Sequence, residues 1–271
     1  MQFAGLKVDN RLFAMVKVTF DTNVWRRVVE IKVDSRNEYR ELRRRIENKD
    51  VESFICEIAL SLESISRKDR PDFWESYIPQ MEMSGRFENN QYSGVFSISP
   101  DTSKHPGMHP ILQRKLAEAQ RLGFKVLRMT NLGTVMCPDI PDSMYTVFSE
   151  GSFWNYCERV AKCSDYIVSH DWGRAQYEIL KNEYNLVGLS VIDCLSKVPP
   201  GKSKAFCDAI AEWVDGDSIS MHFGYSNEYF CTEDRGKGAG KKSVFHEENL
   251  ASLKQAFGLK IVSISELLEA L

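Results

Sequence analysis

The sequence predicts an α/β protein with a mostly parallel sheet, and three observations support this fold class. Short apolar runs alternate with longer segments of helical periodicity along most of the 271 residues. The 43% hydrophobic and 27% charged content is typical of a globular chain that is long enough to bury a core. No apolar run approaches the ~20 residues that a membrane-spanning helix needs.

The first part of the chain is predicted to alternate strands with helices. Residues 12–20 are rich in β-branched and aromatic side chains, which favours a buried strand, and Asp21-Thr22-Asn23 then forms a turn that caps the next segment. Residues 38–48 carry apolar side chains at helical spacing. We expect a strand over 51–56 and a helix over 57–66 to follow.

The middle of the chain begins with an interruption. Pro, Gly, Asn and Ser recur from Pro71 to about Pro110, which predicts a long loop or irregular excursion. Regular structure is expected to return as a helix over 111–122 that stops at Gly123, a strand over 125–129, and helices around 153–163 and 172–184.

The last part again alternates the two kinds of element. Residues 196–204 are rich in Pro, Lys and Ser and predict a second interruption. We expect the following elements after it: a helix over 205–214, a strand over 229–231, a helix over 247–257, a strand over 259–262 and a helix over 265–270.

Four acidic residues stand at positions where strand ends and helix faces would bring them together. Asp21 follows the first strand, Glu57 opens the helix after the second strand, Asp208 lies in the first turns of a late helix, and Asp234 follows the strand over 229–231. Each has an ordinary structural explanation by itself, as a helix cap, a first-turn carboxylate or a turn residue. In a parallel sheet, however, active sites form outside the carboxyl ends of the strands.

The settings of these four residues resemble, in chain order, the motifs of PIN-domain nucleases. The segment FDTNVW at 20–25 is similar to the strand that opens that family, and YFCTEDRGK at 229–237 is similar to its last motif. The segments SFICEIALSL at 53–62 and CDAIAEW at 207–213 match the two motifs between them. The resemblance implies a three-layer α/β/α fold built around a central sheet.

The resemblance also implies a metal site. Asp21, Glu57, Asp208 and Asp234 would be the catalytic carboxylates that hold Mg²⁺ or Mn²⁺, and Asn23 and Thr232 would be supporting polar residues. Magnesium and manganese prefer such hard oxygen ligands, and converging carboxylates are tolerable when a cation neutralises them. Glu63 is an alternative to Glu57, and Glu212 is a candidate additional ligand one turn beyond Asp208.

The chain is longer than small PIN domains between the second and third motifs. Glu57 and Asp208 are 151 positions apart, and we expect residues 66–124 to hold most of an insertion, partly helical, within a single domain over 1–271.

Basic residues fall near the acidic motifs, although the net charge of −3 does not indicate nucleic-acid binding. Lys237, Lys241 and Lys242 form a basic loop beside Asp234 that is suited to a substrate backbone. A second group of basic residues lies within residues 26–45. It is either a solvated helix face or a rim that contacts phosphates, and it consists of Arg26, Arg27, Arg36, Arg40, Arg43, Arg44 and Arg45.

Together these features predict a metal-dependent endoribonuclease that hydrolyses RNA phosphodiester bonds, with single-stranded DNA as an alternative substrate. Two other functions stay open: a catalytically weak interaction module for nucleic acid or protein, and a small-phosphate hydrolase. Seven cysteines without a C-x-x-C pair fit reduced thiols, so we expect a cytoplasmic protein without a membrane segment. The sequence leaves open a homodimer and an antitoxin-like protein partner.

Overall fold

The structure of the protein is a computed structural model. It describes residues 15–64, 80–88, 91–99, 107–129, 137–147, 152–189, 194, 197–199 and 201–271, and their side chains except those of 62–64, 80–88 and 91–99.

The central sheet has five strands, all parallel. They are β1 (Val16–Phe20), β2 (Val51–Cys56), β5 (Lys125–Leu127), β6 (Tyr229–Cys231) and β7 (Lys260–Val262), in the order β5-β2-β1-β6-β7. The central strand β1 pairs with β2 from Val16 opposite Val51 and with β6 up to Phe20 opposite Cys231. This confirms the predicted α/β class and the parallel sheet.

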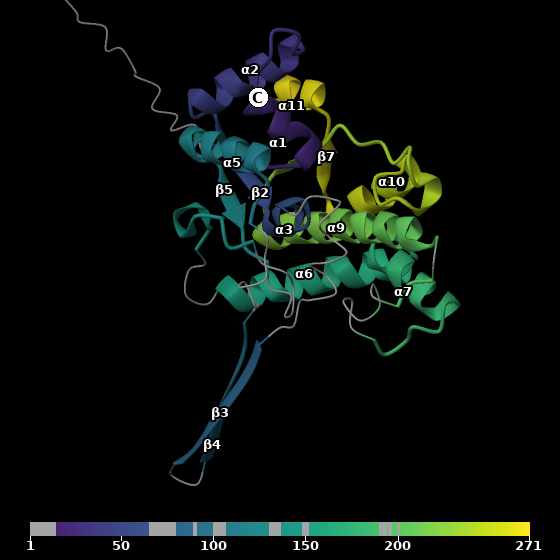
Figure 1. The fold of residues 1–271 in the computed structure, drawn as a ribbon. Helices are drawn as coiled ribbons and strands as arrows, with labels where there is room; N and C mark the ends of the chain where they lie inside the picture. The colour runs from purple at the N-terminus through teal and green to yellow at the C-terminus, as the bar shows by residue number, and fades with distance from the viewer. Residues whose placement is uncertain are drawn as a thin grey trace, which may run out of the picture.

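One face of the sheet is covered by four helices, which lie together above it in Figure 1: α1 (Thr22–Val28), α2 (Asn37–Glu47), α5 (Pro110–Leu122) and α11 (Ile264–Ala270). Val18, Ile55 and Val126 point to this face because alternate residues of a strand face the same side. They share one core cluster with Trp25 and Leu42, both fully buried. Burial against this layer explains the helical periodicity seen in the sequence.

The opposite face carries the other helices of the described residues: α3 (Glu57–Ser64), α6 (Ser152–Ser169), α7 (Arg174–Glu183), α9 (Ser203–Tyr225) and α10 (Glu247–Phe257). Phe54 and Leu127 pack against Met221 of α9 on this side. Phe230 of β6 packs with Ile219, also from α9. The two helical layers therefore enclose the sheet in an α/β/α arrangement (Figure 1).

Helix α9 extends beyond the predicted end near 214 and continues to Tyr225. Its second half contains Gly216 and several Ser and Asp residues, which are poor helix formers. Packing outweighs this propensity, because Ile219 and Met221 in this half are buried in the core. Glycine is needed at position 224, where α9 and α6 approach closely, since a Cβ atom there would stand 2.5 Å from Val160.

The prediction of a long loop or irregular excursion from Pro71 to about Pro110 is wrong for residues 80–88 and 91–99. Strands β3 (Gln80–Glu88) and β4 (Gln91–Ser99) pair in antiparallel fashion as a separate two-stranded sheet, which extends away from the layers (Figure 1). The β-formers in both strands favour this pairing, whereas the many Gly, Asn and Ser residues obscured it. Helix α5, inside the predicted insertion over 66–124, belongs to the main core. Residues 65–79, 89–90 and 100–106 lie outside the described residues.

Two further features concern the cysteines and the helices. None of the seven cysteines, all of which lie among the described residues, forms a disulfide bond. Among the described residues, none of the helices combines the length and apolarity that crossing a bilayer requires.

Candidate functional site

The order of the strands points to the edge where β1 and β6 end. The chain moves outward from β1 to β2 and β5 on one side, and it returns to form β6 and β7 on the other. The carboxyl ends of β1 and β6 therefore flank the point at which the connections change direction, where open parallel sheets form their ligand sites. Asp21 and Thr232 are the first residues after these two strands.

Asp21 is held at this edge by hydrogen bonds to both of its carboxylate oxygens. As the N-cap of α1, it accepts a hydrogen bond at Oδ1 from the backbone N–H of Thr22 (2.6 Å). Its Oδ2 accepts hydrogen bonds from Asn23 Nδ2 and from the hydroxyl of Thr232, each at 2.6 Å. The structure thus brings Asn23 and Thr232 to Asp21, where the sequence places supporting residues.

The segment after β6 is folded around the same hydroxyl group. Thr232 is fully buried, and its Oγ1 accepts a hydrogen bond from the backbone N–H of Asp234 (3.0 Å). Asp234 Oδ1 then accepts one from the backbone N–H of Gly236 (2.7 Å). Gly236 has φ +63°, and a Cβ atom there would stand 2.7 Å from the backbone nitrogen of His246, so this tight turn requires glycine.

Two carboxyl groups at this edge, those of Asp21 and Glu212, have a raised pKa. Burial raises the pKa of Asp21, and the negative charge of Asp234 raises it further, against the lowering effect of its hydrogen bonds. Glu212 of α9 behaves in the same way, since burial raises its pKa and Asp234 and Asp208 add to the rise. Its Oε2 atom is buried and has no hydrogen-bond partner among the described residues. Ionisation of Asp21 and Glu212 is therefore less favourable than that of a free carboxyl group.

Glu57 occupies the predicted position at the end of β2, the strand beside β1. Its side chain is 2% exposed. One carboxylate oxygen accepts a hydrogen bond from the backbone N–H of Met129 (2.7 Å) and the other from the hydroxyl of Tyr145 (2.8 Å). Glu57 is thus anchored at the same edge of the sheet as Asp21, on the neighbouring strand. The side chain of its alternative, Glu63, lies outside the described residues.

Asp208 is the predicted site residue with the least contact to this edge. Its side chain is 65% exposed and forms an ion pair with Lys204, one turn before it on α9 (2.8 Å). The negative charge of Asp208 contributes to the raised pKa of Glu212. The Asp208 side chain itself is exposed to solvent.

Asp217, on the same helix, is a buried carboxylate that is not among the site residues predicted from the sequence. It is 7% exposed and accepts a hydrogen bond from Trp213 Nε1 (2.8 Å). Burial raises the pKa of the Cys56 thiol, and the charges of Asp21 and Asp217 add to this rise, so both carboxylates lie near the end of β2. Asp217 fell outside the helix predicted over 205–214, and only recognition of the longer helix would have revealed it.

The described residues do not contain a ready-made metal centre. No three His, Cys, Asp or Glu side chains among them are grouped closely enough to hold an ion. The donor chemistry nevertheless suits a hard cation, because the acids present carboxylate oxygens, one of which is buried and unpartnered.

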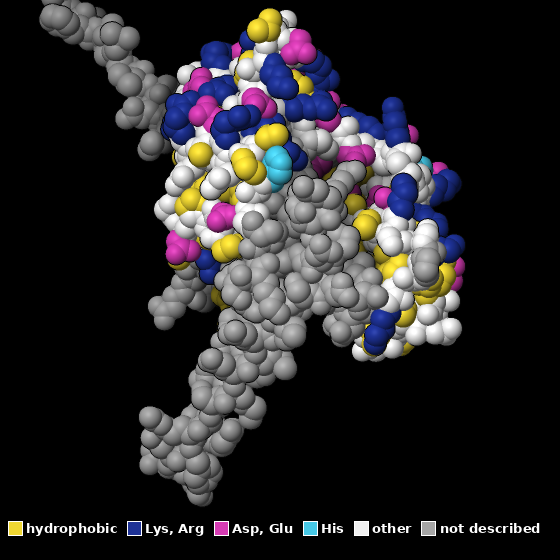
Figure 2. All heavy atoms as spheres, in the orientation of Figure 1, with side chains coloured by type: hydrophobic (Ala, Val, Ile, Leu, Met, Phe, Trp, Pro, Cys, Tyr) yellow, Lys and Arg dark blue, Asp and Glu magenta, His cyan; other side chains and the backbone are white. Residues whose placement is uncertain are grey.

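The predicted substrate-binding lysines lie on the loop that starts beside Asp234. Lys237, Lys241 and Lys242 are exposed, and Lys241 forms an ion pair with Glu248 (3.0 Å). In Figure 2, dark-blue side chains gather near α10 and, more densely, over the part of the molecule where Figure 1 places α2 and α5.

Comparison of the chain with family models, curated proteins and solved structures finds no match.

Proposed function

We propose that this protein is a metal-dependent endoribonuclease with a PIN-like fold, and that its active site lies at the carboxyl ends of β1, β2 and β6. The observation that carries the proposal is the pair Asp21 and Asp234. They follow the two strands at the switch point, are linked through Thr232, and their like charges oppose ionisation of Asp21. A divalent cation would relieve this repulsion.

The proposed ligands come from separate elements that meet at this edge. Asp21, Glu57 and Asp234 keep the roles expected from the sequence. The fourth carboxylate comes from α9, where Asp217 has more support than Asp208 because it is buried and close to the end of β2. Glu212 is an additional ligand near Asp234. Bound Mg²⁺ or Mn²⁺ would activate water and stabilise the leaving oxygen of a phosphodiester.

The surrounding residues would orient the acids and the substrate. Thr232 and Asn23 hold Asp21 Oδ2, and the backbone N–H of Thr22 holds Oδ1, so the carboxylate has one orientation. The exposed lysines after Asp234 would contact the phosphates of the RNA strand, which lowers its electrostatic repulsion from the acids. RNA, rather than single-stranded DNA, is the proposed substrate because the resemblance to PIN-domain nucleases points to it.

The experiment compares the wild-type protein with Asp21→Asn on labelled single-stranded RNA, single-stranded DNA and a phosphomonoester, with Mg²⁺ or Mn²⁺ present. The substitution removes one negative charge while it keeps the size of the side chain. We expect RNA cleavage to fall by about 100-fold or more, the order of magnitude lost when one electrostatic group is removed from an active site, whereas RNA binding persists.

Asp165→Asn is the matched control, because Asp165 is exposed on α6. It should cleave RNA at the wild-type rate. Equal cleavage by Asp21→Asn and wild type would overturn the proposed site, and hydrolysis of the phosphomonoester alone would indicate a small-phosphate hydrolase instead.

A further inference from the structure

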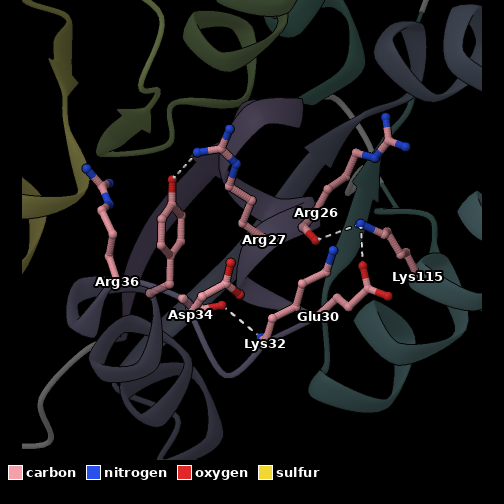
Figure 3. A pocket seen from close by; sticks show the side chains of 9 residues that line it. Arg26, Arg27, Glu30, Lys32, Asp34, Arg36 and Lys115 are labelled. Atoms are coloured by element: carbon pink, nitrogen blue, oxygen red, sulfur yellow. Dashed lines mark hydrogen bonds and ion pairs between the residues drawn. The ribbon is translucent and has the colours of Figure 1, made fainter.

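A surface pocket of about 380 Å³ lies between α1, the loop after it, α2 and α5. Its lining does not include the acids of the candidate site. Five cationic side chains contribute to its lining, against two carboxylates, which leaves an excess of three positive charges: Arg26, Arg27, Lys32, Arg36 and Lys115. Figure 3 shows these side chains arising from several elements around one space, with Lys32 and Lys115 converging over Glu30.

The arginines that crowd into this region of the sequence have two different roles. Arg43, Arg44 and Arg45 of α2 form ion pairs with carboxylates and so resemble an ordinary solvated helix face. Arg26, Arg27 and Arg36 instead line the pocket. Arg40 donates hydrogen bonds to the carbonyls of Lys32 and Val33, which fixes the loop that carries Lys32. The structure thus separates the two interpretations that the sequence left open.

Two of the pocket cations have no carboxylate partner in the described part of the chain. Within the described residues, Arg27 and Lys32 form no ion pair, whereas Glu30 is paired with Lys115 (2.8 Å) and Arg114 (3.2 Å). The pKa of Glu30 is lowered, first by its hydrogen bond to Lys115 and then by the positive charges of Lys115, Arg114 and Lys32. The potential in this pocket is therefore positive even after its internal ion pair is formed.

Two guanidinium groups of the pocket, those of Arg27 and Arg36, are held in place by Tyr39. Tyr39 is 3% exposed, and its hydroxyl accepts a hydrogen bond from Arg27 Nη1 (3.1 Å). The guanidinium of Arg36 lies over the same ring at 4.8 Å from its centre. Because a planar guanidinium matches the geometry of a phosphate, two oriented groups of this kind with a nearby ammonium form a suitable phosphate site.

The pocket is connected to the acidic edge. Arg36 forms an ion pair with Glu233 (2.9 Å), which stands between Thr232 and Asp234 in the chain. The backbone N–H of Glu233 donates to Asn23 Oδ1 (3.0 Å). Arg27 lies six residues after Asp21, or about 9 Å along a helix axis, a distance that a nucleic-acid strand covers within a few phosphates.

We propose that this pocket binds a backbone phosphate of the single-stranded RNA whose other end lies across Asp21 and Asp234. The identity of the ligand rests on the proposed nuclease function, and the presence of an anion site rests on the pocket itself. The pocket would act as an anchor that fixes the strand beside the cleavage site.

The test measures RNA binding separately from cleavage. Fluorescence anisotropy follows a labelled 12-nucleotide single-stranded RNA binding to full-length Asp21→Asn protein over a range of KCl concentrations. Arg27→Gln with Lys32→Gln is then added. We expect Kd to rise at least ~5-fold and the slope of log Kd against log salt to fall by about 0.7, the contribution of one phosphate contact on a single strand.

Lys17→Gln with Lys260→Gln is the matched control, because both lysines are exposed at the starts of β1 and β7, at the opposite edge of the sheet. It should leave Kd and the slope unchanged. Arg27→Lys with Lys32→Arg keeps both charges and should restore most of the affinity, which distinguishes lost contacts from misfolding.

Two outcomes would overturn the proposal: an unchanged Kd and slope in the pocket variant, or an equal loss in the control. Either result leaves the nuclease function to be judged by cleavage in the otherwise unaltered protein. Conversely, RNA that binds through the pocket but is never cleaved would refute the nuclease proposal and support the anion site.

Discussion

Thr232 donates its hydroxyl proton to Asp21 Oδ2 over 2.6 Å, although 211 positions separate the two residues in the chain. The same oxygen of Thr232 accepts the backbone N–H of Asp234. One buried hydroxyl therefore sets the position of both acids that flank the switch point of the sheet. This makes Thr232 the residue through which the geometry of the candidate site is tested most directly.

Thr232→Val should impair the site while it preserves the shape of the side chain. The substitution leaves the backbone N–H of Asp234 without its acceptor and Asp21 without one donor, which costs about 1–3 kcal/mol of stability for buried groups. We expect RNA cleavage or affinity for Mg²⁺ to fall about 10- to 100-fold, as for other residues that orient metal ligands. Cleavage measured against Mg²⁺ concentration separates the two effects.

Thr232→Ser is the control for this experiment, because serine keeps the hydroxyl group. It should retain most of the activity. If the valine variant matched wild type in both rate and Mg²⁺ dependence, Thr232 would have only a structural role.

The sequence predicted the sheet well because its strands are short apolar runs with clear ends. Strands β2 and β6 and helix α10 have the predicted limits. Gly123 ends α5 in a left-handed conformation, as expected. These features depend on local patterns, which one sequence contains in full.

Features that depend on packing were harder to predict. The second half of α9 is helical because it is buried between α6 and the sheet, so its composition gave no local signal. The helix predicted over 205–214 therefore contains Asp208 but not the buried Asp217. The pocket cations likewise differ from the paired arginines of α2 only in their three-dimensional neighbours.

Divalent ions should stabilise the folded protein. Burial and the charge of Asp234 raise the pKa of Asp21 in the folded protein. The protonated carboxyl group therefore contributes stability at low pH. This contribution is lost as the pH rises from the pKa of Asp21 in the unfolded chain through its raised pKa in the folded protein. Mg²⁺ or Mn²⁺ at 100 times its Kd would add about 2.7 kcal/mol, or roughly 5 °C in Tm. Thermal unfolding with and without each ion, from pH 5 to 8, measures the effect.

The metal effect should increase with pH, since the ion competes with the proton on Asp21. Asp21→Asn should reduce it strongly. Identical melting curves for the wild-type protein with and without both ions, at every pH, would contradict a metal site.

Substitutions along α9 should reveal which of its carboxylates belongs to the site. We expect Asp217→Asn to reduce RNA cleavage by about 100-fold, Glu212→Gln to reduce it less, and Asp208→Asn to leave it near wild type. The exposed pair of Asp208 with Lys204 should contribute little to stability, because solvent screens its charges. Cleavage rates and unfolding free energies are measured on the same preparations. A large loss in Asp208→Asn alone would instead support the ligand predicted from the sequence.

The basic loop beside Asp234 should contribute to RNA binding without affecting the metal chemistry. Lys241→Ala with Lys242→Ala removes two exposed charges. We expect weaker binding, with a fall of about 1.4 in the slope of log Kd against log salt. The maximal cleavage rate at saturating RNA should persist. Lys17→Gln with Lys260→Gln again serves as the control, and equal RNA affinity in both variants would exclude a role for this loop.

His222 should make the fold sensitive to acid. Its side chain is buried on α9, with Nδ1 2.9 Å from the hydroxyl of Thr19, and its Nε2 has no hydrogen-bond partner among the described residues. Burial lowers its pKa to about 3, and the positive charge of Arg159 contributes to this shift. The folded protein therefore holds His222 in the neutral form.

The sign of the pH dependence follows from this lowered pKa. The unfolded chain binds a proton at His222 below about pH 6.5, whereas the folded protein does not until about pH 3. Stability that is present above pH 6.5 is therefore lost as pH falls toward 3, by up to ~1.4 kcal/mol per pH unit.

Urea unfolding at several pH values between 7 and 4 should show this loss in wild type and a smaller one in His222→Gln. Because Asp21 and Glu212 have raised pKa values and act in the opposite direction, the comparison of the two proteins isolates the histidine. Parallel pH profiles would show that His222 does not determine the acid sensitivity of the fold.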